Sequence, residues 1–109
     1  MATPPKTSPT PRSAASRLAS QVTIKQLRAF AAVAREGSFT AAAQQLFISQ
    51  SALSALVRTL EAALGLRLLD RTTRRLELTT SGQDLVPTVQ RLLDDLDRMA
   101  GDLFDVTER

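Results

Sequence analysis

The side chains in this sequence that could do chemistry are hydrogen-bonding and cationic groups, not nucleophiles or metal ligands. The 109 residues include no Cys and no His, which excludes disulfides, Cys/His metal sites and nucleophiles that depend on either residue. Three arginines, Arg71, Arg74 and Arg75, fall within five positions. Cations this close repel one another unless a polyanion lies nearby. Sites built from carboxylates alone remain open.

Composition and charge narrow the class of partner. With four Phe and no Trp or Tyr, the chain is not expected to stack the bases of RNA or single-stranded DNA. Residues 1–20 have three basic and no acidic side chains, residues 21–79 have eight basic and four acidic, and residues 80–109 have three basic and seven acidic. This segregation suggests a polyanion partner for the central body alone.

Residues 1–21 are predicted to form a disordered tail. Four of the five prolines fall within the first eleven positions, among Ser, Thr and Ala, and such a composition cannot bury enough apolar surface to fold. An acid-free stretch with Arg and Ser is also typical of a transit peptide, but this density of Pro argues against the amphipathic helix of such peptides. No apolar run reaches membrane-spanning length, so we expect a soluble cytoplasmic protein with no membrane partner.

Three short helices are predicted in the body, residues 22–79. Apolar residues recur at helical spacing over residues 24–36, from Phe39 to Leu46, and over about 49–64. The residues suited to cap these helices are Thr23 with Gln26, Ser38 and Ser49 at the starts, and Gly37 and Gly65 at the ends. The second and third helices are separated by a turn of about three residues, which is the arrangement of a helix-turn-helix. A helical hairpin without a ligand is the alternative.

The outer face of the third helix favours the first interpretation. Its leucines and Val57 share one side, which leaves Gln50, Ser51, Ser54 and Arg58 on the opposite side or its flank. A solvated surface helix usually has Glu and Lys at such positions. Small hydrogen-bonding side chains instead allow close approach to a surface that presents hydrogen-bonding edges.

A β-hairpin is predicted after Gly65, because apolar residues alternate on both sides of the basic segment 71–75. A solvated basic loop is the alternative for this segment taken alone. Next to a helix-turn-helix, the hairpin can serve as a wing that follows phosphates and places Arg in a minor groove.

A long helix over 80–105 is predicted to follow, with residues 106–109 frayed. Thr80 and Gln83 fit a capping box, and Pro87 predicts a kink or a late helix start. The helix has a heptad stripe formed by Leu85, Val89, Leu92, Leu96, Met99 and Leu103. Since this stripe exceeds what one small body can cover, we expect it to pair with a second copy as a homodimer. Packing of the stripe on its own body alone is the alternative.

Several motifs in order resemble the N-terminal DNA-binding domain of LysR-type transcriptional regulators. The similarity covers residues 23–105, about 80 residues. The matching motifs are Leu27-Arg28-Ala29-Phe30, Gly37 to Ala43, Ser49 to Ser54, Leu60-Glu61 with Leu64-Gly65, Arg71 to Arg74, and Leu78 to Gly82. The resemblance implies a mainly α winged helix-turn-helix whose third helix enters the major groove of double-stranded DNA. It also implies an antiparallel dimer formed through the linker helix.

The resemblance also implies roles for individual residues. Gln50 and Ser51 match base-facing positions, Ser54 lies nearer the phosphates, and Arg74 matches the wing arginine of the minor groove. Gln suits bidentate contact with adenine N6 and N7. The full set of DNA-contacting residues predicted from the sequence is Thr40, Ser49, Gln50, Ser51, Ser54, Arg58, Arg71, Arg74 and Arg75.

Three features depart from the family pattern. The family usually has Pro at the position of Ser51 and often a basic residue at that of Ala55. Family members continue into an effector-binding domain of two α/β lobes, whereas this chain ends at Arg109. An excised domain, a truncated product and a stand-alone DNA-binding protein all fit this length. We therefore expect neither an effector site nor a cofactor in this chain.

Two other functions remain open at this point. A truncated interaction module could form mixed dimers with full-length regulators through the 85–103 stripe. A small enzyme could use paired acids, but Asp94, Asp95 and Asp97 are predicted to lie mostly on the solvent side of the long helix. No convergent pocket follows from that spacing. The sequence favours DNA binding in transcription regulation and no enzymatic activity.

Overall fold

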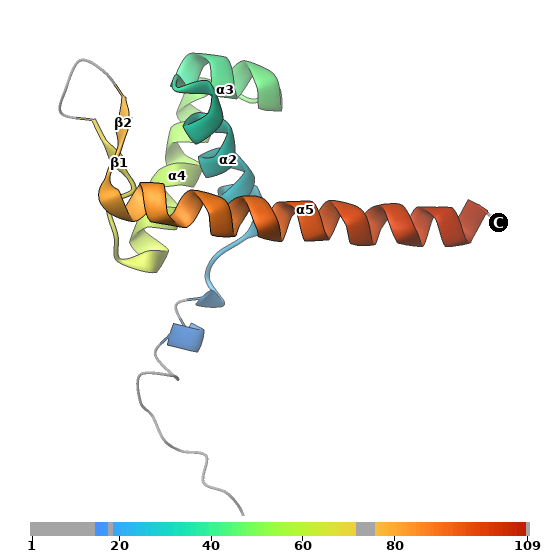
Figure 1. The fold of residues 1–109 in the computed structure, drawn as a ribbon. Coiled ribbons are helices and arrows are strands. Elements are labelled where there is room, and N and C mark those ends of the chain that lie inside the picture. Colours follow the sequence, from blue (N-terminus) through green and yellow to red (C-terminus); the bar gives the residue numbers. More distant parts are fainter. Residues whose placement is uncertain (1–14, 18, 72–75, 109) are drawn as a thin grey trace, which may run out of the picture.

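The computed structural model describes residues 15–17, 19–71 and 76–108. In chain order, the elements are helices α2 (Ile24–Glu36), α3 (Phe39–Leu46) and α4 (Gln50–Leu64), strands β1 (Leu69–Asp70) and β2 (Glu77–Leu78), and helix α5 (Thr80–Glu108). Figure 1 shows α2, α3 and α4 gathered on one side of α5, with the hairpin beside them. The predicted winged helix-turn-helix, mainly α with a small hairpin and a long final helix, is confirmed.

Helix α2 lies at the centre, in contact with α3, α4 and α5. Ala29, Phe30, Ala32 and Val33 on this helix have no exposed surface. The small alanines let the neighbouring helices approach closely, while burial of the Phe30 side chain contributes about 1.5–3 kcal/mol. The predicted capping box is present: the Thr23 hydroxyl accepts from the Gln26 amide at 3.2 Å, and the Gln26 side chain accepts from the Thr23 amide at 2.8 Å.

The turn between α3 and α4 has an unusual backbone conformation. Ser38 and Ser49 cap the two helices as predicted, by accepting hydrogen bonds from the amides of Ala41 and Ala52. Phe47 ends α3 with a φ of 60°, in the left-handed region, and its side chain is 93% exposed. The next residue, Ile48, turns inward and packs against the cluster that contains Leu53. The turn therefore directs α4 across the body with one face toward solvent.

The hairpin is a short antiparallel pair. Leu69 is opposite Leu78 and Asp70 is opposite Glu77. Leu68 and Leu69 are buried, and a hydrogen bond of 3.0 Å from the Thr79 amide to the Leu68 carbonyl continues the pairing toward α5. The basic tip, residues 72–75, lies outside the described residues.

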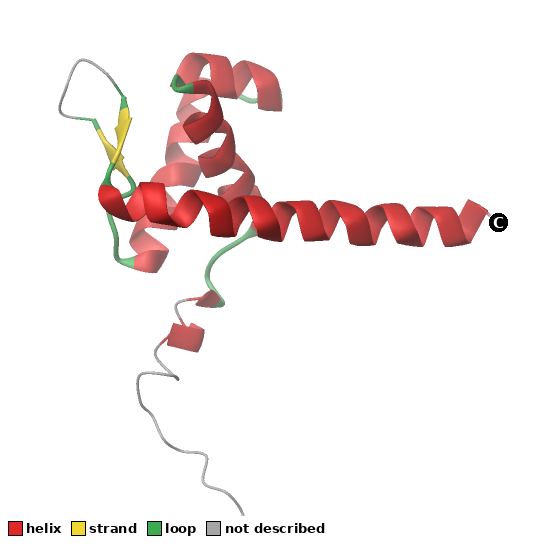
Figure 2. Cartoon of the chain, viewed as in Figure 1, coloured by secondary structure: helices red, strands yellow, loops and turns green. Residues whose placement is uncertain are grey.

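The start of α5 differs in two ways from the predicted one. Thr79, not Thr80, caps it: the Thr79 hydroxyl accepts from the Gly82 amide at 3.0 Å and donates to the Arg67 carbonyl at 2.6 Å. The late start predicted from Pro87 is wrong, because the helix begins at Thr80 and includes this residue. Figure 2 shows α5 as one continuous helix. Gln83 is exposed, so water can bond the carbonyl that loses its amide partner at Pro87.

The heptad stripe is divided between two environments. Val89 is 1% exposed and Leu85 packs against the same cluster, which includes Leu27, Phe30 and Leu60. Val89 therefore covers the body of its own chain and has no surface left for the predicted contact with a second copy, whereas Leu85 is half-buried on the same body. By contrast, Leu92, Met99 and Leu103 are more than half exposed. The C-terminal half of α5 extends past the other helices (Figure 1).

Only part of the predicted tail is described. Residues 15–17 and Ala19 are helical and Ser20 and Gln21 form a turn, in contrast to the irregular chain predicted there. The Ser20 amide donates to the Ser16 carbonyl at 3.0 Å, and the Ser20 hydroxyl donates to the Arg17 carbonyl at 2.8 Å. Residues 1–14 lie outside the described part. Among the described residues, no helix is both long and apolar enough to cross a membrane.

Two glycines of α5 give a matched test of the packing at its start. A Cβ on Gly82 would clash with the Leu68 backbone carbonyl, whereas one on Gly101 would meet nothing within 4 Å. We expect Gly82→Ala to lower the free energy of unfolding by about 1–3 kcal/mol, because backbone cannot move away as a flexible side chain can. Gly101→Ala should raise it by up to about 1 kcal/mol.

Urea denaturation at one fixed protein concentration measures both changes. Equal stability of the two variants would contradict the close approach of α5 to the hairpin.

Candidate nucleic-acid interface

The N-terminus of α4 presents small hydroxyl groups to solvent. The Ser49 hydroxyl accepts from the Ala52 amide at 3.0 Å and lies 3.4 Å from the Ser51 hydroxyl. Both serines and Gln50 are exposed. A helix N-terminus has partial positive charge and amides without intrahelical partners, so it favours an anion or the electronegative edge of a base.

A hydrogen bond joins the starts of α3 and α4. The Thr40 hydroxyl donates to the Gln50 side-chain carbonyl at 3.3 Å, and both residues are exposed. Thr40 therefore orients Gln50 from a neighbouring helix. The pair places a hydroxyl and an amide together, two groups able to donate and accept.

Arg58 extends along α4 toward the same end. Its Nη2 donates to the Ser54 hydroxyl at 2.9 Å, one helical turn earlier. Arg58 is exposed and Ser54 is half-buried. The structure thus places five predicted residues at or soon after the start of α4, namely the N-cap Ser49 and the helix residues Gln50, Ser51, Ser54 and Arg58, with Thr40 bonded to Gln50.

Arg71 is predicted from the sequence to contact DNA, but its side chain is turned toward other residues of the chain. Its Nη2 lies 3.6 Å from Glu61 Oε1, and its guanidinium stands 5.3 Å from the centre of the Phe39 ring. The side chain is only 31% exposed. Arg74 and Arg75, the other two predicted wing contacts, lie outside the described residues.

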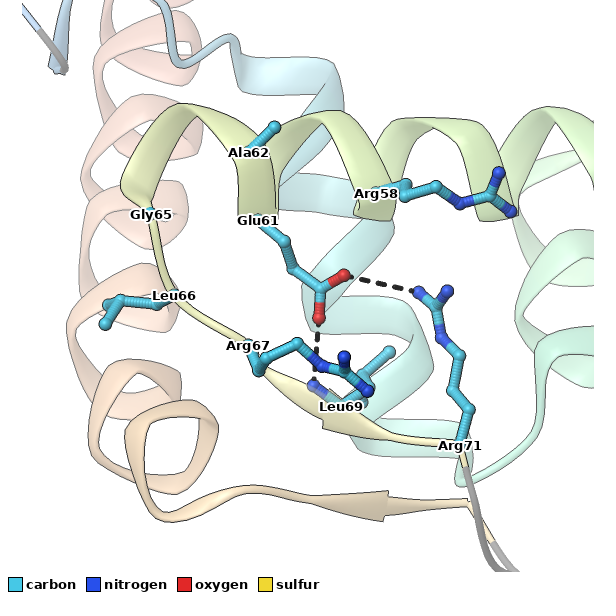
Figure 3. A pocket seen from close by; sticks show the side chains of 8 residues that line it. All are labelled: Arg58, Glu61, Ala62, Gly65, Leu66, Arg67, Leu69 and Arg71. Atoms are coloured by element: carbon cyan, nitrogen blue, oxygen red, sulfur yellow. Dashed lines mark hydrogen bonds and ion pairs between the residues drawn. The ribbon is translucent and has the colours of Figure 1, made fainter.

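A pocket of about 460 Å³ separates the second half of α4 from the hairpin. Figure 3 shows Glu61 reaching from α4 toward β1, with Arg58 and Arg67 on either side and Arg71 facing it. Three guanidinium groups and one carboxylate thus line the pocket, which leaves it with net positive charge. Sequence reasoning missed Arg67, and its available signal was a cation two residues before the first strand.

A second hollow lies on another side of α4. It has a volume of about 560 Å³ and is mostly apolar, with Ala55 and Leu56 of α4 among its lining residues. Lys25 and Arg28 of α2 also line it. Ala55 departs from the basic residue common at this position in the family that the sequence resembles, and here it opens onto this hollow.

Three acids of α5 have polar side-chain partners. Arg28 Nη2 bonds Asp97 Oδ1 at 3.0 Å, Asp95 pairs with Arg98 at 3.1 Å, and Asp94 accepts from Gln90 at 3.1 Å. Exposed pairs of this kind each contribute about 0–1 kcal/mol. No group of three or more His, Cys, Asp or Glu side chains in the described part of the chain is placed to hold a metal ion.

Comparisons with known proteins identify relatives of this fold. The sequence profile described as "Bacterial regulatory helix-turn-helix protein, lysR family" matches residues 24–83. The chain is 47% identical over 94 residues to the HTH-type transcriptional regulator PtxR of Pseudomonas aeruginosa, covering 86% of this chain and 30% of PtxR. It is 46% identical to PgrR of Escherichia coli K12, covering 79% of this chain and 29% of PgrR. The chain thus spans less than a third of the length of these relatives.

Solved structures agree with this result. The structure described as the BenM_DBD/catB site 1 DNA complex superposes with a TM-score of 0.74 at 35% identity, covering 78% of this chain and 96% of that one. Vibrio fischeri DarR in complex with DNA has a TM-score of 0.74 at 30% identity, covering 80% of this chain and 30% of that one.

The two serines at the start of α4 have separable roles in stability. We expect Ser49→Ala to lower the free energy of unfolding by about 1 kcal/mol, because the Ala52 amide loses its capping acceptor. The matched change Ser51→Ala removes a hydroxyl from the same turn without removing the cap. It should change stability by no more than about 0.5 kcal/mol.

Thermal unfolding followed by circular dichroism compares the two variants. An equal effect of both changes would show that Ser49 does not cap α4.

Proposed function

The chain belongs to the LysR family of bacterial helix-turn-helix regulatory proteins, and we propose that it binds a double-stranded DNA operator as the DNA-binding part of a transcription regulator. The observation that carries the proposal is the exposed start of α4. Gln50, Ser51 and Ser54 are gathered there at a helix N-terminus, with Arg58 one turn beyond. An α-helix of this kind fits the major groove of B-form DNA, where each base pair presents a distinct pattern of donors and acceptors.

In this proposal, base recognition comes from the first turn of α4. The Gln50 side chain reads an adenine through its amide and carbonyl, and Ser51 hydrogen-bonds a neighbouring base edge. The bond from Thr40 supports this role because it orients Gln50 before DNA arrives. Ala55 offers a methyl surface that can contact a thymine methyl group.

Affinity that does not depend on the DNA sequence comes from contacts to the phosphate backbone of the DNA. In this proposal, phosphates are bonded by Arg58 on α4, Thr40 on α3 and the amides at the start of α4; the exposure of both side chains supports this role. Arg74 and Arg75 of the wing complete the set, with Arg74 in the minor groove, as the family resemblance implies. The excess of basic side chains over residues 21–79 supports attraction to a polyanion.

We further propose a homodimer formed through the outer half of α5, and a cytoplasmic location on the nucleoid. Leu92, Met99, Leu103 and Phe104 are each more than half exposed on one helix that extends past the body. Exposed apolar surface of this extent favours burial against another protein surface. The alternative of an interaction module without DNA binding is not favoured, because the family profile covers residues 24–83 rather than the stripe.

Selection of DNA by the purified chain tests the proposal directly. Random-sequence duplexes would be incubated with the chain, and bound fragments would be recovered and sequenced over several rounds, with sedimentation velocity reporting mass with and without DNA. A dimer on fragments that share a two-fold symmetric site is expected. Absence of any retained duplex at low salt would overturn the proposal.

Gln50→Ala should change which base is preferred at one position of each half-site. The selected duplex should lose about 1–3 kcal/mol of discrimination at that position, because the bidentate contact to adenine is removed. Gln45→Ala is the matched control, since this exposed glutamine of α3 pairs with Arg35 instead. Repeating the selection with both variants measures the effect. Weakening of Gln50→Ala binding by the same factor on all sequences would refute base recognition by this residue.

Met99→Asp should weaken the dimer at least about ten-fold, since a symmetric interface would bury two charged side chains where it now has apolar ones. Gly101→Asp adds the same charge to an exposed position nearly opposite on the helix and should leave the dimer intact. Sedimentation equilibrium over a range of protein concentrations measures both dissociation constants. Equal dissociation constants for the two variants would place the dimer interface elsewhere.

A further inference from the structure

Glu61 is the acid on the second half of α4, and it is largely withdrawn from solvent. Its side chain is only 12% exposed. Oε2 accepts from the backbone amides of Leu68 and Leu69 at 2.8 and 3.1 Å, and Oε1 lies 3.6 Å from Arg71 Nη2. Figure 3 shows both sides of this arrangement, with the carboxylate spanning from α4 to the start of the hairpin. One side chain therefore joins α4 to the base of the wing at three points.

Arg71 is held on the other side by Phe39. The guanidinium lies over the ring of this first residue of α3, at 5.3 Å from its centre, a distance at which a cation is attracted to the ring face. The Nε and Nη2 atoms of Arg71 are buried and make no hydrogen bond within the described residues. Arg71 therefore connects the strand end to both helices of the helix-turn-helix. It is also the last described residue before the wing tip, 72–75.

Electrostatics alone would disfavour a carboxylate in this place. Glu61 lines the same pocket as Arg58 and Arg67, beside the surface assigned above to DNA phosphates. A negative charge there opposes a polyanion. The contacts of Glu61 offset this cost by fixing the wing relative to α4. A helix can enter a DNA groove while a wing contacts the adjacent DNA backbone only if the two are held in a fixed relative position.

We propose that Glu61 and Arg71 are positioning residues, which hold the wing against α4 so that Arg74 and Arg75 reach DNA, and that Arg71 is not itself a phosphate contact. This inference rests on the proposed function. It changes the role predicted for Arg71 from the sequence, and it gives Glu61 a role that charge alone would not suggest.

The direction in which one substitution changes DNA affinity separates a positioning role from a simple charge effect. Glu61→Gln raises the net charge by one, so electrostatics predicts tighter DNA binding. Loss of positioning predicts weaker binding, by about ten-fold. Glu77→Gln is the matched control, because Glu77 is an exposed acid of β2. Its neutralisation should leave affinity unchanged or raise it.

A double-substitution cycle gives the second readout. In the wild-type background, Arg74→Ala should lower affinity and reduce the slope of log affinity against log salt by about one. In the Glu61→Gln background the same change should have little further effect, because the wing is no longer positioned. A general loss of stability would leave the Arg74→Ala effect intact, so the cycle distinguishes positioning from destabilisation.

Arg71→Met keeps the experiment informative if Glu61→Gln does not fold, as judged by circular dichroism. It keeps an unbranched side chain at this position and removes the guanidinium that lies over the Phe39 ring and beside Glu61. Under the proposal, Arg71→Met also abolishes the effect of Arg74→Ala. If Arg71 bonds a phosphate directly, the two substitutions add, and the proposal is overturned.

All affinities would be measured by fluorescence anisotropy on the duplex selected by the wild-type chain. Tighter or unchanged binding by folded Glu61→Gln would also overturn the proposal. If the wild-type chain retains no duplex, the proposed function fails instead, and the two failures are thereby distinguished.

Discussion

The burial of α2 is the constraint on which the other elements depend. A chain of this size has one small core, and α2 supplies the surface against which α3, α4 and α5 all pack. Ala29 and Ala32 keep the helices close, and Phe30 and Val33 fill the remaining volume. Because α4 must cover α2 with Leu53, Val57 and Leu60, its opposite face is left to solvent. The exposed surface of the predicted recognition helix is thus a consequence of core packing.

Helix α5 meets two demands along one stripe. Near its start, Leu85 and Val89 complete the core beside Leu60 and Phe30, and Gly82 permits the close approach to Leu68 that this requires. Further along, the same heptad spacing continues with Leu92 and Met99, which are more than half exposed, although Leu93 beside Leu92 is buried. One periodicity therefore supports both the packing of the domain and the surface proposed for a second copy. The ion pair of Arg28 with Asp97 lies near the change between these two environments.

Charges in the body are arranged around Glu61, an acid whose side chain is only 12% exposed. Arg58 and Arg67 face the pocket beside α4, and Glu61 is directed inward to two backbone amides and Arg71. The pairing leaves the outer surface basic while the acid orders the base of the wing. Under the proposal above, Arg58 and Arg67 attract DNA phosphates, whereas Arg71 aligns the wing with α4. The number of cations in the cluster does not by itself show this difference.

The sequence by itself determined the local elements. Capping residues predicted the starts of α2, α3 and α4, and glycines predicted the C-terminal ends of α2 and α4, since caps act through hydrogen bonds within a few residues. The left-handed Phe47 that ends α3 was not predicted. Order and spacing of motifs also predicted the family, and hence the exposed start of α4. Pro87 does not delay the start of α5, because a helix that is well capped and packed can tolerate one lost amide bond.

Only the tertiary structure decided which equivalent-looking residues have different surroundings. Val89 and Met99 share a heptad stripe, but the first is buried by the body and the second extends past it. Arg58 and Arg71 are both basic residues of the predicted DNA surface, yet only Arg71 is held by Glu61 and Phe39. The physical reason is the same in both cases. Burial and pairing depend on contacts between residues distant in the chain, and these contacts exist only once α2, α4, the hairpin and α5 have packed together.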